Sequence, residues 1–147
     1  MSPDEPLVWP SRYPPTHRWK RFFIGVRWLG PDLAFLQDFR DRQTLRSQKS
    51  LETWPTAVSR RLALIVGEAL VGNGVGWSTP WFVPNDHFAV MLHGPRFQTT
   101  DDLATDATIS EIERRVGRRF TEEFWQQSAK LNFGEVVRQM LEYGAAA

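Results

Sequence analysis

The sequence predicts a mainly helical protein of one domain, in which a small helical bundle at residues 55–144 follows an aromatic, proline-rich N-terminal extension. Two observations indicate this fold class. Apolar residues recur at helical spacing in residues 55–71 and again through the C-terminal third, and turn or capping residues separate these stretches. A chain of 147 residues also has the size that a single domain with its own core commonly has.

The N-terminal part consists of an arm followed by an extension. Residues 1–18 hold five of the ten prolines, and proline fixes φ and removes an amide donor, so we expect an extended, partly disordered arm there. Residues 19–54 form the extension. Its aromatic stretch at 18–30 fits either a short strand pair or a buried turn, because its apolar residues follow neither period clearly.

A first helix is predicted after Pro31. Proline is common at the first position of a helix, and Asp32 follows it near the positive end of the helix dipole. Asp38 and Arg42 are spaced for an ion pair across one turn of this helix. The residues that follow, 43–50, are polar, and we expect them to form a loop.

The clearest amphipathic pattern of the central part lies at residues 55–71. Four apolar residues recur there at helical spacing, which predicts a helix with one buried face: Val58, Leu62, Ile65 and Ala69. The sequence Gly72-Asn73-Gly74 then predicts the end of this helix, since glycine readily adopts the backbone conformations that terminate helices.

The segment at 76–88, GWSTPWFVPNDHF, combines four aromatic residues with two prolines, which exclude a helix. We expect it to be a hydrophobic strap whose rings pack between the 55–71 helix and the C-terminal helices: Trp77, Trp81, Phe82 and Phe88. The overlapping stretch at 87–94 fits either a short strand or one helical turn.

Capping patterns mark three helices in the C-terminal third. Residues 108–111, Thr-Ile-Ser-Glu, form a capping box that predicts a helix start, and Gly117 predicts the end of that helix. Thr121 precedes two glutamates and predicts the start of a short helix. Residues 132–135, Asn-Phe-Gly-Glu, repeat the capping pattern and predict a last helix that ends at Gly144.

The order of these elements resembles the helical domains of the acyl-carrier-protein family. The resemblance covers about residues 58–143 and implies a helical bundle over that range. It rests on the 60–72 helix, the loop Phe82-Val-Pro-Asn-Asp86 after it, the helix end Ile112-Glu-Arg-Arg-Val-Gly117, the entry to the short helix at Phe120-Thr-Glu-Glu-Phe124 and the last motif Asn132-Phe-Gly-Glu-Val-Val137.

The same resemblance implies what this chain lacks. The family's Asp-Ser-Leu attachment motif falls on Asp101-Asp102-Leu103, so Asp102 stands where the family has the serine that carries phosphopantetheine. A carboxylate cannot serve as that attachment hydroxyl. We therefore expect that the chain is not a functional acyl carrier and that it uses no cofactor.

Composition favours a cytoplasmic, bacterial protein. The chain has no cysteine, which excludes disulfides, thiolate catalysis and cysteine-based zinc sites. The first ten residues carry acids and prolines rather than a signal-peptide pattern, and the longest apolar run, at 62–72, is too short to span a bilayer, so we expect no membrane partner. Fifteen of the 18 basic residues are arginine, as is common in proteins from GC-rich bacterial genomes.

Asp86, His87 and His93 are the candidates for a catalytic or metal centre. Their spacing fits neither the helical pair nor the adjacent strands that are common in zinc and iron sites, which favours structural roles, with Asn85 or Asp86 bonding local backbone in a turn. The alternative is a small metal-dependent or acid–base enzyme that uses these residues together with the carboxylates at 101–106. Motifs such as GxSxG and HExxH are absent from the sequence.

Partner binding has two groups of candidate residues. Four arginines cluster at one predicted helix end, and two tryptophans lie in the extension: Arg114, Arg115, Arg118 and Arg119, with Trp19 and Trp28. Basic and aromatic residues alternate at 17–23, as in single-stranded RNA binders, but a net charge of +1 disfavours a nucleic-acid partner. The sequence thus favours a non-catalytic protein-interaction module, such as an adaptor, immunity-type or regulatory protein, with an RNA-binding accessory protein as a further alternative.

Overall fold

The computed structural model describes residues 4–8, 23–24, 27–28, 34–73, 75–95 and 102–146. Over these residues the protein is mainly helical, which confirms the predicted fold class. No helix among them is both long and apolar enough to cross a membrane. The elements, in chain order, are β1 (Phe23–Ile24), β2 (Arg27–Trp28), α1 (Ala34–Thr44), the 3-10 helix η2 (Gln48–Thr53), α2 (Ala57–Gly72), α3 (Phe88–His93), α4 (Asp102–Val116), α5 (Glu122–Ser128) and α6 (Phe133–Ala146).

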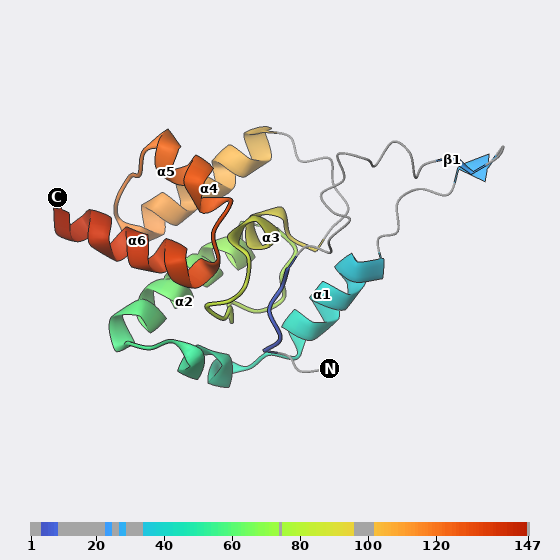
Figure 1. Ribbon diagram of the computed structural model, residues 1–147, viewed down its shortest axis with the longest axis horizontal. Helices are drawn as coiled ribbons and strands as arrows, with labels where there is room; N and C mark the ends of the chain where they lie inside the picture. Colours follow the sequence, from blue (N-terminus) through green and yellow to red (C-terminus); the bar gives the residue numbers. More distant parts are fainter. Residues whose placement is uncertain are drawn as a thin grey trace.

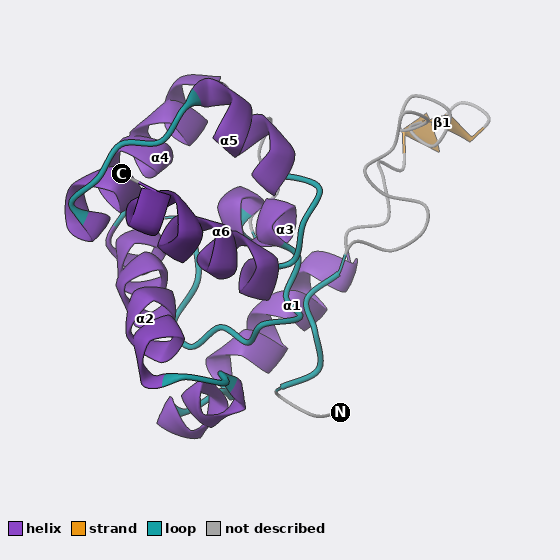
Figure 2. Cartoon of the chain, turned by 60° about the vertical axis from the view of Figure 1, so that its left-hand side comes forward, coloured by secondary structure: helices purple, strands orange, loops and turns teal. Residues whose placement is uncertain are grey.

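The helices surround a core in which α2 and α6 are central. Figure 2 shows α6 in the middle of the bundle, with α4 and α5 on one side of it and α1 on the other. Helix α2 packs against both α4 and α6, and the short α3 packs against α4 (Figure 1). The two strands pair antiparallel, with Phe23 opposite Trp28 and Ile24 opposite Arg27.

Helix α2 begins at a capping box that also sets which of its faces is buried. Thr56 and Ser59 bond each other's backbone N–H groups, and Ser59 is buried. Successive residues of a helix lie about 100° apart around its axis. Because the capping box turns Ser59 inward, Val58 faces solvent and is 60% exposed, so its predicted place on the buried face was wrong. The helix ends at Gly72, with Asn73 as its C-cap, as the sequence predicted.

The prediction of a loop at 43–50 was wrong, because helices occupy both ends of this range and several of its polar side chains are buried. Helix α1 continues to Thr44 and η2 begins at Gln48, and three polar side chains between and around them are buried: Gln43, Arg46 and Ser50. They are buried because they hydrogen-bond other segments; for example, the amide Nε2 of Gln43 donates to the carbonyl oxygen of Thr79 at 2.6 Å. The predicted ion pair of Asp38 and Arg42 is present at 3.0 Å.

The capping box predicted at 108–111 is not a helix start. Helix α4 begins at Asp102, and Thr108 lies in its interior, where its buried hydroxyl accepts a hydrogen bond from Nδ2 of Asn73 at 2.8 Å. The Thr-x-x-Glu pattern therefore serves a contact between α4 and the end of α2. The predicted end of α4 is confirmed: Gly117 has a φ of +82°, a conformation that favours glycine.

The starts of α5 and α6 follow their capping residues. Oγ1 of Thr121 accepts from the N–H of Phe124 at 3.1 Å, and Oδ1 of Asn132 accepts from the N–H of Glu135 at 2.9 Å. Two further N–H groups of α6 donate to the preceding loop, from Phe133 to the carbonyl oxygen of Asp86 and from Gly134 to that of Pro84. The loop thus satisfies α6 donors that have no intrahelical partner. Helix α6 runs two residues beyond the predicted end, to Ala146.

Aromatic rings form the centre of the core. Phe133, which is fully buried, lies with its ring centroid 5.0 Å from that of Trp54, 6.3 Å from that of Phe82 and 6.0 Å from that of Phe88. These spacings are typical of favourable ring pairs. The cluster therefore joins the end of η2, the 76–88 segment, α3 and α6 in one packed unit.

Candidate functional site

The 76–88 segment covers the core with three of its four large rings buried. Trp77, Phe82 and Phe88 are at most 4% exposed, whereas Trp81 is half-buried and packs against the edge of the core. The indole N–H of Trp77 donates to the carbonyl oxygen of Met91 at 2.9 Å, so burial leaves this donor satisfied. Trp77, Phe82 and Phe88 therefore pack inside the protein and are unavailable to a partner.

Asp86 is a buried structural carboxylate. Arg46 donates to both of its oxygens, from Nη1 to Oδ2 at 2.7 Å and from Nη2 to Oδ1 at 2.9 Å, and neither side chain has any exposed surface. The backbone N–H of Leu7 donates to Oδ1 and that of Val83 to Oδ2, both at 2.9 Å. Each carboxylate oxygen thus already accepts two hydrogen bonds, which leaves Asp86 without a lone pair for a metal or a substrate proton.

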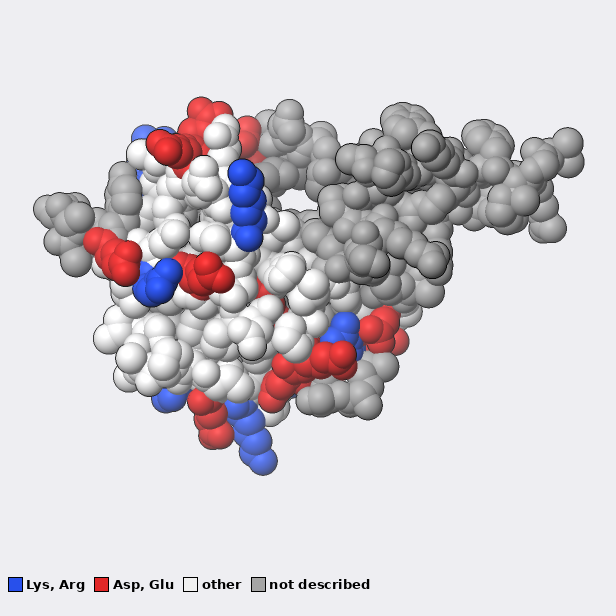
Figure 3. Space-filling view, in the orientation of Figure 1, with Lys and Arg blue, Asp and Glu red and all other residues white. Residues whose placement is uncertain are grey.

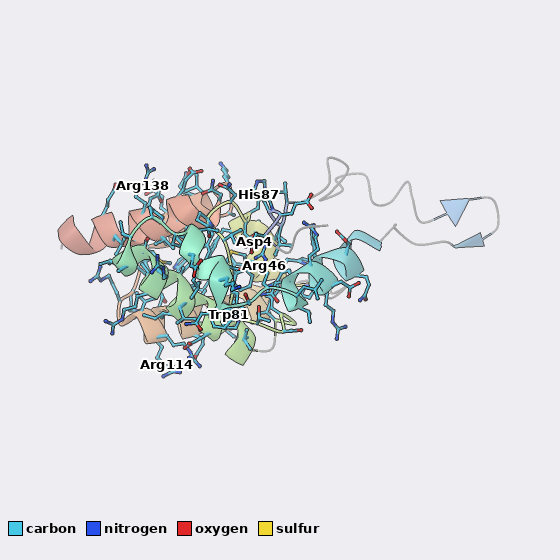
Figure 4. All side chains as sticks on the ribbon, turned by 90° about the horizontal axis from the view of Figure 1, so that it is seen from below. Asp4, Arg46, Trp81, His87, Arg114 and Arg138 are labelled. Atoms are coloured by element: carbon cyan, nitrogen blue, oxygen red, sulfur yellow. The ribbon has the colours of Figure 1, made fainter. Side chains whose placement is uncertain are left out.

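The same network holds residues 4–8 against the body of the protein. Nη2 of Arg46 also donates to the carbonyl oxygen of Glu5 at 3.1 Å, and the hydroxyl of Ser50 bonds the carboxylate of Asp4 at 2.5 Å. Leu7 is fully buried. Figure 4 shows Asp4 and Arg46 close together beside the cyan helix α1. Sequence reasoning missed Arg46, because an arginine in a polar stretch carries no signal of its buried partner.

His87 and His93 lie at the two ends of α3. His87 is exposed and precedes the helix, whereas His93 is half-buried and its Nδ1 lies 2.8 Å from the carbonyl oxygen of Gly94. Across the described residues, no group of three or more His, Asp or Glu side chains is arranged to hold a metal ion. Of the carboxylates at 101–106, Asp106 is exposed, Asp102 is the first residue of α4, and Asp101 lies outside the described residues.

The predicted arginine cluster divides into two paired and two unpaired side chains. Glu111 bonds Arg114 through Nη2 at 2.6 Å and Arg115 through Nε at 2.7 Å. These hydrogen bonds, first that with Arg114 and then that with Arg115, lower the pKa of Glu111 to about 2. Arg118 and Arg119 are exposed and form no ion pair with any described residue.

The structure does not place the two tryptophans predicted for partner binding in a site. Trp19 lies outside the described residues, and Trp28 is described only as part of the strand β2. The RNA-binding candidates at 17–23 also lie outside the described residues, apart from the backbone of Phe23. The candidate site therefore does not include these residues.

An apolar groove lies between the start of α2 and one face of α6. Its volume is about 400 Å³, within the range of small ligand-binding sites. One wall is formed by residues 54–56 and Ser59, and the other by a stripe along α6. The α6 residues, with Pro84 and Asn132 at the loop end, are Gly134, Glu135, Val137, Arg138 and Leu141.

The lining of this groove is largely apolar, with one acidic and one basic side chain, Glu135 and Arg138. Leu141, which lines the groove, is 37% exposed, and Val58 lies next to the groove-lining Ser59. In Figure 3 the area over α2 is largely uncharged, whereas acidic and basic side chains lie along α6. Sequence patterns could have found Leu141, because the apolar residues of the last helix recur at helical spacing and include it. They could not show that residues 54–59 stand opposite it.

No protein-family model, curated protein or solved structure matches the chain.

Proposed function

We propose that this protein is a non-catalytic interaction module that binds another protein through the groove between residues 54–59 and α6. The observation that carries the proposal is the apolar groove itself, with Leu141 exposed in its lining. The exposed Val58 precedes the lining residue Ser59 in the sequence. Exposed apolar surface around a hollow is typical of sites that become buried on association. The fully bonded state of Asp86 also favours recognition over acid–base chemistry.

The shape of the groove favours an amphipathic helix of the partner as its occupant. The stripe from Gly134 to Leu141 covers eight residues of α6, and the seven steps between its ends correspond to about 10 Å at the helical rise. Apolar side chains at positions i, i+3 or i+4, and i+7 of a second helix span the same length. The rim offers both signs of charge, Glu135 and Arg138, so either polar flank of such a helix can pair with it.

The proposal also includes the cellular location and the order of helices that the sequence favours. We place the protein in the bacterial cytoplasm, an expectation that rests on its lack of cysteine and its arginine bias. The order of a long α2, a long α4, a short α5 and α6 supports an acyl-carrier-like layout over about 58–143. Asp102, which stands where the family's serine would be, rules out that family's attachment chemistry.

Selection of displayed helical peptides on the purified protein tests this function. We expect the enriched sequences to carry apolar residues three or four positions apart. Leu141→Glu should weaken their binding by about tenfold or more, because a charge buried against apolar side chains costs more than about 1.4 kcal/mol. Val58→Lys should act in the same direction with a smaller effect, because Val58 precedes the lining residue Ser59 but does not line the groove itself.

Leu45→Glu is the matched control. Leu45 is 67% exposed and lies outside the groove, so this variant introduces the same charge at an exposed leucine elsewhere. Peptide affinity should be unchanged for Leu45→Glu, and both variants should keep the melting temperature of the wild type. The proposal is wrong if no peptides are enriched, or if the enriched peptides bind the Leu141 and Leu45 variants equally.

A further inference from the structure

A second hollow lies at the C-terminal end of α4 and is polar, whereas the groove at α6 is apolar. Its volume is about 440 Å³, and its lining is polar and mostly basic: Ser110, Glu113, Arg114, Gly117, Arg118 and Arg119. We call these six residues the arginine pocket. The turn at Gly117, with its φ of +82°, ends α4 so that two arginines beyond the helix join Arg114 around one hollow. We infer that the arginine pocket binds a phosphate monoester.

The formal charge of the pocket favours a dianion. Its lining holds three arginines and one glutamate, +3 and −1, for a net charge of +2. Glu113 is held by other groups, since its Oε2 accepts from the N–H of Phe120 at 2.7 Å and from the indole of Trp125 at 3.4 Å. The neighbouring Glu111 bonds both Arg114 and Arg115, and adding the charges of Glu111 and Arg115 leaves the total unchanged.

Two of these arginines form no ion pair within the described part of the fold. A cation in the last turn of a helix is favourable because of the helix dipole, which accounts for Arg114 and Arg115 without any ligand. Arg118 and Arg119 lie beyond the helix, are exposed, and have no ion-pair partner among the described residues. Figure 4 shows Arg114 at the outer edge of the bundle, where a dissolved ligand can reach it.

The chemistry of the lining selects phosphate over a carboxylate. A guanidinium group offers paired N–H donors that match two oxygens of a phosphate or carboxylate. A phosphate monoester carries about −1.5 to −2 charges at pH 7, which matches a net +2, whereas one carboxylate carries −1. The end of α4 adds only about half a negative charge, less than the arginines supply. The hydroxyl of Ser110 can donate to a third oxygen.

NMR titration of the arginine Nε–Hε signals tests the inference on the full chain. The probes are inorganic phosphate, O-phosphoserine, a short phosphoserine peptide and the same peptide with glutamate instead. We expect saturable shifts for Arg114, Arg118 and Arg119 with the three phosphate probes. Binding should weaken below about pH 6, where phosphate loses its second charge. A phosphopeptide that binds more tightly than O-phosphoserine indicates a protein-borne phosphate, and equal affinities indicate a small phosphorylated molecule.

The variant Arg118→Gln/Arg119→Gln should weaken phosphate binding by about tenfold or more, since each lost hydrogen bond between charged groups contributes at least a factor of about ten. The control Arg40→Gln/Arg61→Gln removes the same charge from two exposed arginines on α1 and α2. Equal weakening in both variants would reduce the effect to general attraction between charges and overturn the inference. So would an equal affinity for the glutamate peptide, or the absence of saturable shifts. Neither variant touches the groove at α6, so this result is independent of the peptide selection.

Discussion

Arg46 and Asp86, 40 positions apart in the sequence, form a fully buried ion pair in which two guanidinium nitrogens bond the two carboxylate oxygens. The pair joins the turn after α1 to the loop before α3, and the N–H of Leu7 adds the N-terminal segment to it. A buried pair of this kind contributes little net stability over a well-packed apolar pair, but loss of one partner leaves the other charged and buried.

Removal of either partner should therefore be strongly destabilising. We expect Asp86→Ala and Arg46→Met each to lower the free energy of unfolding by about 3–5 kcal/mol in urea denaturation. The double variant Arg46→Met/Asp86→Leu should recover part of this loss, because no uncompensated charge remains. Recovery should be incomplete, since the N–H groups of Leu7 and Val83 lose their acceptor. Single variants that cost less than about 1 kcal/mol would contradict a structural role for the pair.

The two tryptophans of the 76–88 segment should differ in their contribution to stability. Trp77 is buried and bonds Met91, so Trp77→Ala should cost about 3–5 kcal/mol. Trp81 is half-buried, so Trp81→Ala should cost less but still lower the melting temperature by about several degrees. Thermal unfolding of both variants checks this order. The reverse order, or an unchanged melting temperature for Trp81→Ala with loss of peptide binding, would move Trp81 to the binding surface.

Gly67 allows the 76–88 segment to approach α2. A Cβ at this position would overlap the carbonyl oxygen of Pro80, which is backbone and cannot move aside alone. Gly67→Ala should therefore destabilise the protein by about 1–3 kcal/mol, although alanine favours a helix. Gly72→Ala, in the same helix, is the control: its Cβ meets only the flexible end of Arg115. Calorimetry that found both variants stabilised would show that the loop does not pack on Gly67.

The pKa of Glu111 should be about 2, because Arg114 and Arg115 hydrogen-bond its ionised form. The carboxyl titrates near 4.5 without these partners, so its contribution to stability is present above pH 4.5 and is lost as the pH falls through about 2. NMR titration of the side-chain carboxyl carbon measures this value. In Arg114→Gln/Arg115→Gln the pKa should return toward 4.5. A wild-type value already near 4.5 would mean that these pairs do not persist in solution.

Local patterns predicted several helix boundaries well. Thr121 and Asn132 each bond a backbone N–H three residues further on, so their capping role depends on neighbours that the sequence also shows. Thr108 has the same local pattern, but α4 extends through it and its hydroxyl meets Asn73, 35 positions away. A capping pattern is therefore reliable only where no long-range contact competes for the same side chain.

The candidate site was predicted less well than the fold. The arginine cluster was visible in the sequence because its members lie within six positions. The spacing of Glu111 and Arg115 predicted their ion pair, which is present at 2.7 Å. The sequence did not show that Glu111 also bonds Arg114, or that Arg118 and Arg119 line a hollow. The groove at α6 was not predicted, because its two walls come from residues that are about 80 positions apart.

The sequence by itself determined that the chain is mainly helical, where α2 ends, and where α5 and α6 begin. These properties depend on the residue type at one position or on interactions across a few neighbouring residues. Tertiary structure decided which polar residues are buried, which face of α2 meets the core, and where a groove and an arginine pocket open. The physical reason is that burial and ion pairing depend on what lies opposite a side chain, and in this protein that is usually a residue distant in the chain.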